Sequence, residues 1–360
     1  MTTLAHLAAT ALLTSAAASL VIISTSKFHG RLTFDRSDGV QKVHSAPTPR
    51  VGGVAIALAL ISATLLLPRE IEARSIALCL GLASLPAVLV GLWEDLAKNV
   101  RPAVRLCSHF ISAGLLVIGG GYVLRHSGFD QTDQLLQFTP LAVVVSIVCV
   151  AGVTNAVNLI DGYNGLAPGS VVIMSLGLAI LSARIGDSQV FMVAVLLAAA
   201  VAGFLFLNFP FGKIFLGDAG AYLCGFALAA LVLVLAVRHP GLSPWVPLLI
   251  IIYPVWEVLV SMKRRLGKRG RDPSKADRAH LHHLVARSIS RPLSRRLKWA
   301  MGSNSLTAVA LWPLPLLASL IALNVEMTSV NALLGIVVFQ AFYERIYRIT
   351  RIKKPSASSG

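Results

Sequence analysis

Charged side chains are scarce in this sequence of 360 residues and make up only 13% of it. Soluble globular proteins carry about 25%. Hydrophobic residues account for 56%, and the mean hydropathy is +0.74. This composition excludes an ordinary soluble protein, because several apolar stretches reach the roughly 20 residues that a helix needs to cross a bilayer. We therefore expect an all-α integral membrane protein.

Cysteine is also sparse, and its spacing indicates no chemistry. The four cysteines each lie alone within or near an apolar stretch, which argues against a disulfide framework and a thiolate metal site. The first apolar stretch lacks the positive segment of a cleavable signal peptide, so it is interpreted as a membrane span that is kept. No internal repeat is visible, which argues against a transporter built on inverted repeats.

Hydropathy predicts eleven membrane spans. They cover residues 4–25, 52–67, 75–93, 103–124, 138–154, 166–183, 189–207, 219–237, 244–262, 305–323 and 329–346. Together they form one polytopic domain over residues 1–346, followed by a cytoplasmic tail at 347–360.

Basic residues are divided unevenly between the two sides of these spans. If the loop 26–51 is cytoplasmic and the spans alternate, that side holds 27 of the 32 Lys and Arg residues. Cytoplasmic loops carry such an excess, which predicts eleven spans with a cytoplasmic C-terminus. The predicted cytoplasmic loops are 26–51, 94–102, 155–165, 208–218 and 263–304. The net charge of +16 then follows mostly from topology and does not indicate nucleic-acid binding.

The most informative polar segment is 155–167, Asn-Ala-Val-Asn-Leu-Ile-Asp-Gly-Tyr-Asn-Gly-Leu-Ala. It spaces Asn155, Asn158, Asp161 and Asn164 three residues apart, so that they follow one helical stripe at the end of a span. An ionisable residue at membrane depth is costly and therefore indicates function. Two glycines in the run allow the backbone to approach a ligand closely.

Two further clusters lie on the same predicted side. Lys42, His44 and Arg50 precede the second span and are candidate phosphate ligands. Glu94 and Asp95 form an acidic pair at the cytoplasmic end of the third span. Adjacent carboxylates repel each other unless a cation or a proton joins them, and at a helix C-terminus they also oppose the macrodipole. The pair therefore indicates a specific role.

Asp218 and a group of histidines complete the candidate site. Asp218 begins the eighth span between two glycines, shortly after Lys213, while His280, His282 and His283 lie in the basic loop. A zinc site there would want further soft ligands, which the sequence does not offer, so hydrogen bonds to phosphate or sugar fit better. Carboxylates together with cations suit a magnesium-bound pyrophosphate.

Three motifs together resemble one family. They are Asn-x-x-Asn-x-x-Asp-Gly-x-Asn-Gly-Leu-Ala at 155–167, Leu-Gly-Asp-x-Gly at 216–220 and His-x-His-His at 280–283. In this order and spacing they are similar to the polyprenyl-phosphate N-acetylhexosamine-1-phosphate transferases, glycosyltransferase family 4. These bacterial membrane enzymes start O-antigen, teichoic-acid linkage and peptidoglycan lipid intermediates. The resemblance runs from about Lys42 to His283, and the histidine motif is similar to the branch that uses UDP-N-acetylglucosamine or a related UDP-sugar.

The resemblance implies an enzyme of the bacterial inner membrane with its active site on the cytoplasmic face. It would transfer N-acetylhexosamine-1-phosphate, with N-acetylglucosamine-1-phosphate favoured, from a UDP-sugar to undecaprenyl phosphate. UMP would leave, and the lipid product would start a cell-surface polysaccharide such as O-antigen. Mg²⁺ is the implied cofactor, with Mn²⁺ as a second candidate. The implied partners are the two substrates and membrane lipids, without nucleic acid, and a homodimer is left open.

The resemblance also implies residue roles. Asp218 would be the magnesium ligand, with Asp95 as a second one. The implied catalytic residues are Glu94, Asp95 and Asp161, of which one member of the acidic pair deprotonates or positions the lipid phosphate. The candidate substrate-binding residues are Lys42, His44, Arg50, Asn155, Asn158, Asn164, Lys213, His280, His282 and His283.

Two positions depart from the family pattern. The acidic pair of the family is usually Asp-Asp, whereas this chain has Glu94 before Asp95. The extra methylene moves the first carboxylate by about 1 Å, a displacement that matters in a catalytic geometry. Asn164 stands where many members have Asp, which removes one charge. Which carboxylate performs which task is therefore left open.

Two other classes of function remain as alternatives. A transporter or flippase for a polyprenyl-linked or anionic substrate would also place charged residues in a membrane bundle. Transport sites usually lie near the bilayer midplane, whereas these clusters lie at span ends on one face. A catalytically weakened member kept as an assembly partner is suggested by Glu94 and Asn164. The sequence leaves open both direct attack and a covalent enzyme intermediate.

Overall fold

The computed structural model describes residues 2–35, 47–266, 280–297 and 302–352. In these ranges the chain is helical, and its β-structure is one isolated bridge between Phe34 and Pro49. The α-helices are α1 (Thr2–Ser24), α2 (Ser26–Thr33), α3 (Gly52–Leu66), α4 (Glu72–Ala97), α5 (Pro102–Gly114), α6 (Asp130–Leu136), α7 (Thr139–Ile160), α8 (Leu166–Arg184), α9 (Ser188–Asn208), α10 (Gly217–Arg238), α11 (Trp245–Ile250), α12 (Ile252–Leu266), α13 (Leu281–Val285), α14 (Arg291–Arg296), α15 (Gly302–Leu311), α16 (Pro313–Asn324) and α17 (Ser329–Ile352). Two π-helices, η1 (Leu115–Gly119) and η2 (Ala286–Ser290), follow α5 and α13. The predicted all-α membrane fold is confirmed.

The number of spans differs from the prediction. In the described ranges, eight helices are long and apolar enough to cross a membrane: α1, α4, α5 with η1, α7, α8, α9, α10, and α15 with α16. α3 is apolar but only 15 residues long. The predicted span 244–262 falls on two helices, α11 and α12, and the last falls on α17, which carries charged residues near its end. The count of eleven is therefore not confirmed, because hydropathy averages polarity over a window and does not detect breaks in a helix.

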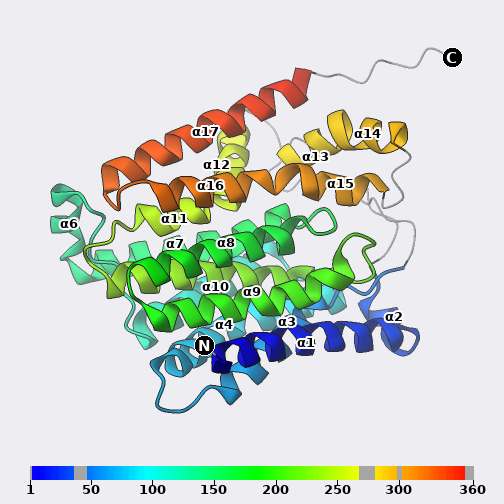
Figure 1. Cartoon of the computed structure of the whole chain (residues 1–360), viewed down its shortest axis with the longest axis horizontal. Helices are drawn as coiled ribbons and strands as arrows, with labels where there is room; N and C mark the ends of the chain where they lie inside the picture. The colour runs from blue at the N-terminus through cyan, green and yellow to red at the C-terminus, as the bar shows by residue number, and fades with distance from the viewer. Residues whose placement is uncertain (1, 36–46, 267–279, 298–301, 353–360) are drawn as a thin grey trace.

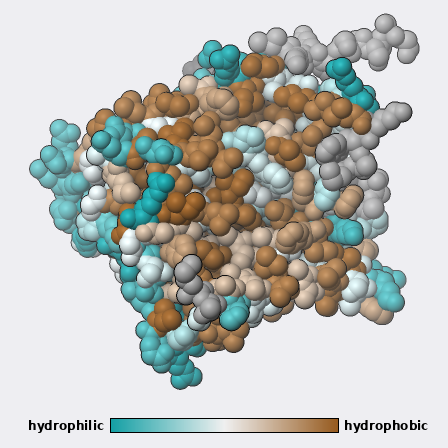
Figure 2. Space-filling model, viewed as in Figure 1, coloured by the Kyte–Doolittle hydropathy of each residue, from teal (hydrophilic) through white to brown (hydrophobic). Residues whose placement is uncertain are grey.

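α10 lies at the centre of the bundle and is buried over most of its length. It packs against α4, α7 and α3, while α1 and α9 pack together beside them. In Figure 1 most long helices run in roughly the same direction, with α6 at one end of the bundle and α2, α13 and α14 at the other. On the face that Figure 2 shows, hydrophobic residues cover much of the surface between these ends, as expected of a protein that lies in lipid.

Glycines bring three helices together at the end of the bundle where α13 and α14 lie. A Cβ added to Gly53 of α3 would come 2.3 Å from the backbone nitrogen of Gly220 in α10. A Cβ on Gly91 of α4 would come 2.7 Å from Ala219. The backbones therefore approach as closely as glycine allows. This contact places the start of α3, the end of α4 and the start of α10 side by side.

Two predicted loops are partly helical. α7 continues through Ile160, so the first half of the predicted loop 155–165 is its last turn and a half. α4 likewise continues through Ala97 and ends at Lys98, which has a φ of 56°. Asn and Glu lower the hydropathy of a segment without breaking its backbone hydrogen bonds, which explains why the sequence placed both ends too early.

Candidate active site

Asp95, near the end of α4, binds the first turn of α10. Its Oδ1 accepts the backbone N–H of Asp218 at 2.8 Å, and its Oδ2 accepts that of Ala219 at 3.0 Å. Gly217 has a φ of 75°, and a Cβ there would lie 2.5 Å from Asp95 Oδ2. Asp95 is fully buried and satisfies two of the four N–H groups that a helix start leaves free. This accounts for the Leu-Gly-Asp turn.

Asp218 is the centre of a charged cluster. Arg50 Nη2 donates to its Oδ1 at 2.6 Å. Arg105 Nη1 and the hydroxyl of Tyr222 donate to its Oδ2 at 3.2 and 3.1 Å. Asn158 Nδ2 in turn donates to the Tyr222 hydroxyl at 3.2 Å. A buried carboxylate needs such compensation, and here two guanidinium groups and a tyrosine provide it.

Arg50 joins the two aspartates. Its Nε lies 3.3 Å from Asp95 Oδ1, while Nη2 binds Asp218. The segment before α3 is held in place by backbone hydrogen bonds, since Phe215 N donates to Pro49 O at 2.8 Å and Gly52 N donates to Phe215 O at 2.9 Å. The Arg50 side chain is only partly exposed, at 30%. Arg50 therefore faces the carboxylates of α4 and α10.

Glu94 points away from this centre. Its Oε2 accepts the backbone N–H of Val100 at 2.8 Å, and its Oε1 lies 3.8 Å from Arg105 Nη1. The longer side chain thus reaches the loop that connects α4 to α5. In this arrangement Glu94 positions Arg105 and the loop, and Asp95 lies closer to Asp218.

Asp161 follows the last residue of α7 and is half-buried. Burial raises the pKa of its carboxyl to about 7, against the opposing effect of Arg50, and Asp218 adds to the rise. The side chain therefore lies within the electrostatic reach of the same cluster. Near neutral pH it exchanges a proton readily, as a general base must.

The asparagines of segment 155–167 differ in their surroundings. Asn155 is exposed on α7, whereas Asn158 reaches Tyr222. Asn164 is buried: its backbone N–H donates to Asn304 Oδ1 at 2.9 Å, and its Nδ2 donates to Pro210 O at 3.4 Å. Asn164 therefore holds the turn against its neighbours.

The same turn has further supports outside the predicted set. Asn208 Oδ1 accepts the N–H of Gly165 at 2.7 Å, and Trp312 Nε1 donates to the Gly165 carbonyl at 3.0 Å. Lys213 is exposed in the segment before α10. Lys42 and His44 lie outside the described residues.

The three predicted histidines form one cluster against this turn. The rings of His280 and His282 stack at 5.4 Å, and His283 Nδ1 is hydrogen-bonded to the hydroxyl of Tyr163 at 3.1 Å. His280 Nδ1 lies 3.6 Å from the buried Glu257. A Cβ on Gly162 would lie 3.5 Å from His282 Nε2. His280 and the first residues of α13 therefore lie against the Asp-Gly turn.

His282 has an unusual environment. It is buried, and among the residues that the structure describes its Nδ1 has no hydrogen-bond partner. Burial lowers the pKa of its imidazole well below the usual value, and the nearby His283 and His280 lower it further. The ring is therefore neutral at pH 7, with one nitrogen that donates and one that accepts. A buried polar atom without a partner is costly, so this nitrogen is a candidate contact for a ligand.

Sequence reasoning missed Arg105, Tyr222 and His109. In the sequence, Arg105 is one of the basic residues that predict the orientation in the membrane, and nothing marks it as a site residue. Tyr222 lies one turn after Asp218, a spacing that places two side chains on one helix face and was the available signal. The ring of His109 meets that of Tyr222 at 4.3 Å, edge to face. No pattern in the sequence indicates this last contact.

The carboxylates of the cluster differ in how well they suit a metal ion. Among the described residues, no group of three or more His, Cys, Asp and Glu side chains gathers as a metal site. Mg²⁺ nevertheless needs only one or two protein carboxylates, since water and substrate phosphates complete its coordination. Asp218 fits this role because its partners are side chains that can rotate away, whereas both oxygens of Asp95 accept backbone N–H groups.

Asp95 and Glu94 should therefore differ in their effect on stability. Asp95→Asn replaces one acceptor with a donor that faces an N–H, and we expect it to lower the free energy of unfolding by about 2 kcal/mol. Glu94→Gln keeps an acceptor for Val100, and we expect a loss under about 1 kcal/mol. Thermal unfolding of both variants in detergent measures the difference. Equal losses would contradict the capping role of Asp95.

Known proteins resemble this chain over most of its length. The sequence profile of glycosyl transferase family 4 matches residues 77–236. A "Probable undecaprenyl-phosphate N-acetylglucosaminyl 1-phosphate transferase" of Bacillus subtilis is 26% identical over 322 residues, which cover 86% of this chain and 88% of that protein. An "Undecaprenyl-phosphate alpha-N-acetylglucosaminyl 1-phosphate transferase" of Yersinia pestis is 29% identical and covers 69% and 68%.

A third relative is more similar in sequence than the first two. A "Decaprenyl-phosphate N-acetylglucosaminephosphotransferase" of Mycobacterium leprae is 31% identical over 284 residues, 67% of each chain. The profile match begins within α4 and ends within α10, and it includes Asp95, Asp161 and Asp218. From this similarity and the three motifs, the chain belongs to glycosyl transferase family 4, the polyprenyl-phosphate hexosamine-1-phosphate transferases.

Proposed function

We propose that this protein transfers N-acetylglucosamine-1-phosphate from a UDP-sugar to undecaprenyl phosphate and releases UMP. The names of its relatives support a polyprenyl-phosphate acceptor and a donor of N-acetylglucosamine phosphate. The observation that carries the proposal is Asp218, held between Arg50 and Arg105 beside a turn that a histidine cluster covers. Such a site suits two substrates that each bring phosphate.

The two arginines would bind the phosphates of both substrates. Guanidinium groups form paired hydrogen bonds with phosphate oxygens, and substrate phosphates would take over the contacts that Asp218 now makes. Once released, the Asp218 carboxylate is available to Mg²⁺, with Mn²⁺ as the second candidate. The metal would neutralise charge on the phosphates as UMP leaves.

The remaining residues would orient the reactants. Asp161, whose pKa is about 7, would take the proton of the lipid phosphate. His282 and His283 would hold the donor sugar or its phosphate through nitrogens that lie at the Asp-Gly turn. Asp95 would keep the start of α10 in place. The acceptor phosphate would then attack the sugar-bearing phosphate of the donor directly.

The reaction would take place at the cytoplasmic face of the bacterial inner membrane. Nucleotide sugars are polar, and the excess of Lys and Arg in loops on the side of this site supports that orientation. The lipid product would start a cell-surface polysaccharide, for which O-antigen is the first candidate. Membranes from cells that express the chain, supplied with a panel of radiolabelled UDP-sugars, test both donor and activity. We expect radioactivity in the lipid extract with UDP-N-acetylglucosamine and with no other donor. If no donor transferred radioactivity to the lipid extract, the proposal would be contradicted.

The pH dependence of transfer should report Asp161. Since the pKa of its carboxyl is about 7, the base is ionised above that pH, and activity should rise through pH 7. We expect Asp161→Asn to lose this ascending limb and to fall by about 10²-fold at pH 8. Because the folded pKa exceeds the unfolded one, the protonated group stabilises the fold at low pH, and this contribution is lost as the pH rises through 7.

Initial rates from pH 5.5 to 9 for wild type and Asp161→Asn measure both effects. Asn155→Ala serves as a control, since Asn155 is exposed on α7, the helix that precedes Asp161, and it should keep the ascending limb. An unchanged limb in Asp161→Asn would assign the titration to another group and remove Asp161 as the base.

A further inference from the structure

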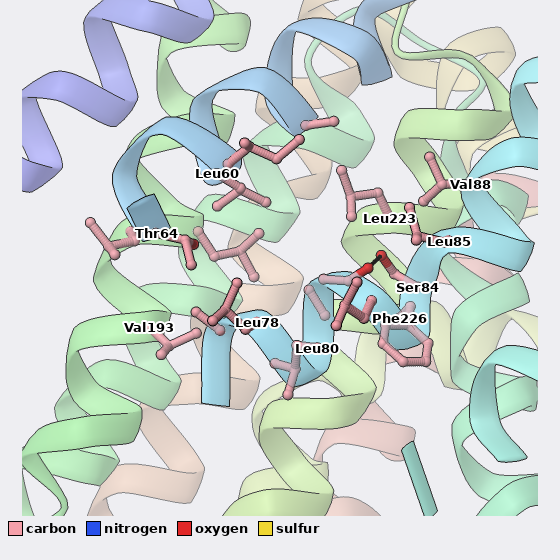
Figure 3. Close-up of a pocket in the computed structure, with 18 of the residues that line it drawn as sticks. Leu60, Thr64, Leu78, Leu80, Ser84, Leu85, Val88, Val193, Leu223 and Phe226 are labelled. Carbon is pink, nitrogen blue, oxygen red and sulfur yellow. Dashed lines mark hydrogen bonds between the residues drawn. The ribbon is translucent and has the colours of Figure 1, made fainter. Parts of the chain in front are cut away.

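A buried glutamate on α12 has no role in the proposed mechanism. Glu257 is only 1% exposed, and a carboxyl group in such a place is costly unless a specific partner requires it. The hollow between α3 and α4 is different in kind. Figure 3 shows Leu60, Leu85 and Phe226 around it, and its described lining contains no titratable side chain. The unused polar chemistry therefore lies at Glu257.

The described residues place three polar groups near the Glu257 carboxyl group. Nδ1 of His280, the residue before α13, lies 3.6 Å from its Oε2. The hydroxyls of Tyr253, one turn earlier on α12, and of Tyr343 on α17 lie within electrostatic reach. In the described ranges, Glu257 Oε1, His280 Nδ1 and both hydroxyls lack hydrogen-bond partners. A small rotation would bring the imidazole N–H to Oε2 and leave Oε1 to the tyrosines.

His280 directs its side chain toward α12 and not into its own helix. It occupies the N-cap position of α13 but makes no capping hydrogen bond with its ring. The ring instead stacks on that of His282, with centroids 5.4 Å apart and planes at 6°. A carboxylate that accepts Nδ1–H fixes both the tautomer and the plane of an imidazole. Glu257 is therefore placed to set the plane on which His282 lies.

His282 has a second histidine neighbour with an anchor of its own. The His283 ring lies 4.4 Å from that of His282, edge to face, and its Nδ1 is hydrogen-bonded to the Tyr163 hydroxyl at 3.1 Å. Tyr163 thus anchors one neighbour of His282, and Glu257 would anchor the other, His280. His282 itself has an Nδ1 without a partner among the described residues. Its position therefore depends on the two rings beside it.

We propose that Glu257 is a positioning residue for the donor: it accepts the Nδ1–H of His280 and so holds the ring on which His282 stacks. The proposal rests on the proposed function, in which His282 contacts the donor sugar or its phosphate. It adds a buried residue of α12 that none of the three motifs contains. Because Glu257 would touch neither substrate, its effect should appear in donor binding and not in the chemical step.

Glu257→Met removes the acceptor and keeps the length of the side chain. An apolar residue of similar size can replace a buried charged group without loss of stability, so the variant should unfold at the wild-type temperature or above. We expect the KM for the UDP-sugar to rise about fivefold, the value of one hydrogen bond. The kcat and the KM for undecaprenyl phosphate should stay unchanged. Glu257→Gln, whose amide oxygen can still accept, should keep the wild-type KM.

A double-mutant cycle shows whether Glu257 acts through His280. His280→Ala should raise the same KM, and Glu257→Met should add nothing in that background. Glu344→Gln is the matched control, since Glu344 lies next to Tyr343 on α17 but is 40% exposed and pairs with Arg348 at 3.4 Å. Its KM values should be those of wild type.

Three kinetic results would overturn the proposal. They are a wild-type KM in Glu257→Met, an equal rise in Glu257→Gln, and effects of Glu257→Met and His280→Ala that multiply. A lower unfolding temperature of Glu257→Met, with both KM values raised, would assign Glu257 to packing and overturn it as well.

The proton on the His280 ring is a readout that does not depend on turnover. Solid-state nitrogen NMR of the full chain in lipid, labelled on histidine and assigned with His280→Ala, shows which ring nitrogen carries it. At alkaline pH we expect the proton on Nδ1 in wild type, and no such preference in Glu257→Met. A proton on Nε2 in wild type would overturn the proposal. If wild type transfers to no acceptor, the proposed function fails, while these spectra still decide the contact between Glu257 and His280.

Discussion

Asp218→Asn should abolish sugar-phosphate transfer, with a loss of at least about 10³-fold, while the protein still inserts into the membrane. The carboxylate binds Arg50 at 2.6 Å and Arg105 at 3.2 Å. In the proposed mechanism it would instead bind Mg²⁺ once the arginines hold substrate phosphates. An amide keeps the size of the side chain but removes the charge on which both functions depend. Preorganised charges of this kind contribute several kcal/mol to a transition state. Initial rates across a Mg²⁺ titration measure the effect.

Asp187→Asn is the matched control. Asp187 is another buried aspartate, 3% exposed, and its Oδ2 accepts from Arg238 Nε at 2.7 Å. It caps α9, at the opposite end of α10 from Asp218. This variant should lose stability but keep its turnover per folded molecule. If Asp218→Asn kept near-wild-type turnover at limiting Mg²⁺, Asp218 would not be the metal ligand.

His282→Ala should raise the KM for the UDP-sugar by roughly 10- to 150-fold, the value of one hydrogen bond to a charged phosphate at about 1.5–3 kcal/mol. The His282 imidazole is buried and neutral, its Nδ1 has no partner within the described ranges, and its Nε2 faces the Asp-Gly turn. In the proposed mechanism His282 holds the donor and not the acceptor, so the KM for undecaprenyl phosphate should change little. Steady-state kinetics with both substrates varied decides between the two sides of the site.

His126→Ala provides the comparison for a histidine remote from the site. His126 lies in the connection between η1 and α6, where its Nε2 is 3.3 Å from the carbonyl oxygen of Leu242. Both KM values of this variant should remain those of wild type. If His282→Ala impaired only the use of the lipid, the histidine cluster would belong to the acceptor side and the donor role would be wrong.

Much of the fold followed from polarity alone. Long apolar runs predicted an all-helical membrane bundle, and the structure confirms it. Clusters at span ends on one predicted face also came together, since Arg50, Asp95 and Asp218 are in contact. Such a convergence is predictable because the ends of packed helices on one face have few places to lie.

The partners of each side chain were less accessible from the sequence. Glu94 binds the loop at Val100, and Asn164 faces Asn304, far along the chain. Both contacts depend on rotamers and on packing between distant segments, which motif spacing does not contain. The sequence did not indicate Arg105 as a site residue, because basic residues are common at the cytoplasmic ends of membrane spans whatever their function.

The nucleotide released by the purified protein tests the central claim most directly. With UDP-N-acetylglucosamine, undecaprenyl phosphate and Mg²⁺, transfer of the sugar together with its phosphate must release UMP, in an amount equal to the lipid product. Transfer of the sugar alone would release UDP. The account predicts UMP, dependent on the lipid and absent with Asp218→Asn. Release of UDP, or of no nucleotide while the lipid is present, would contradict it.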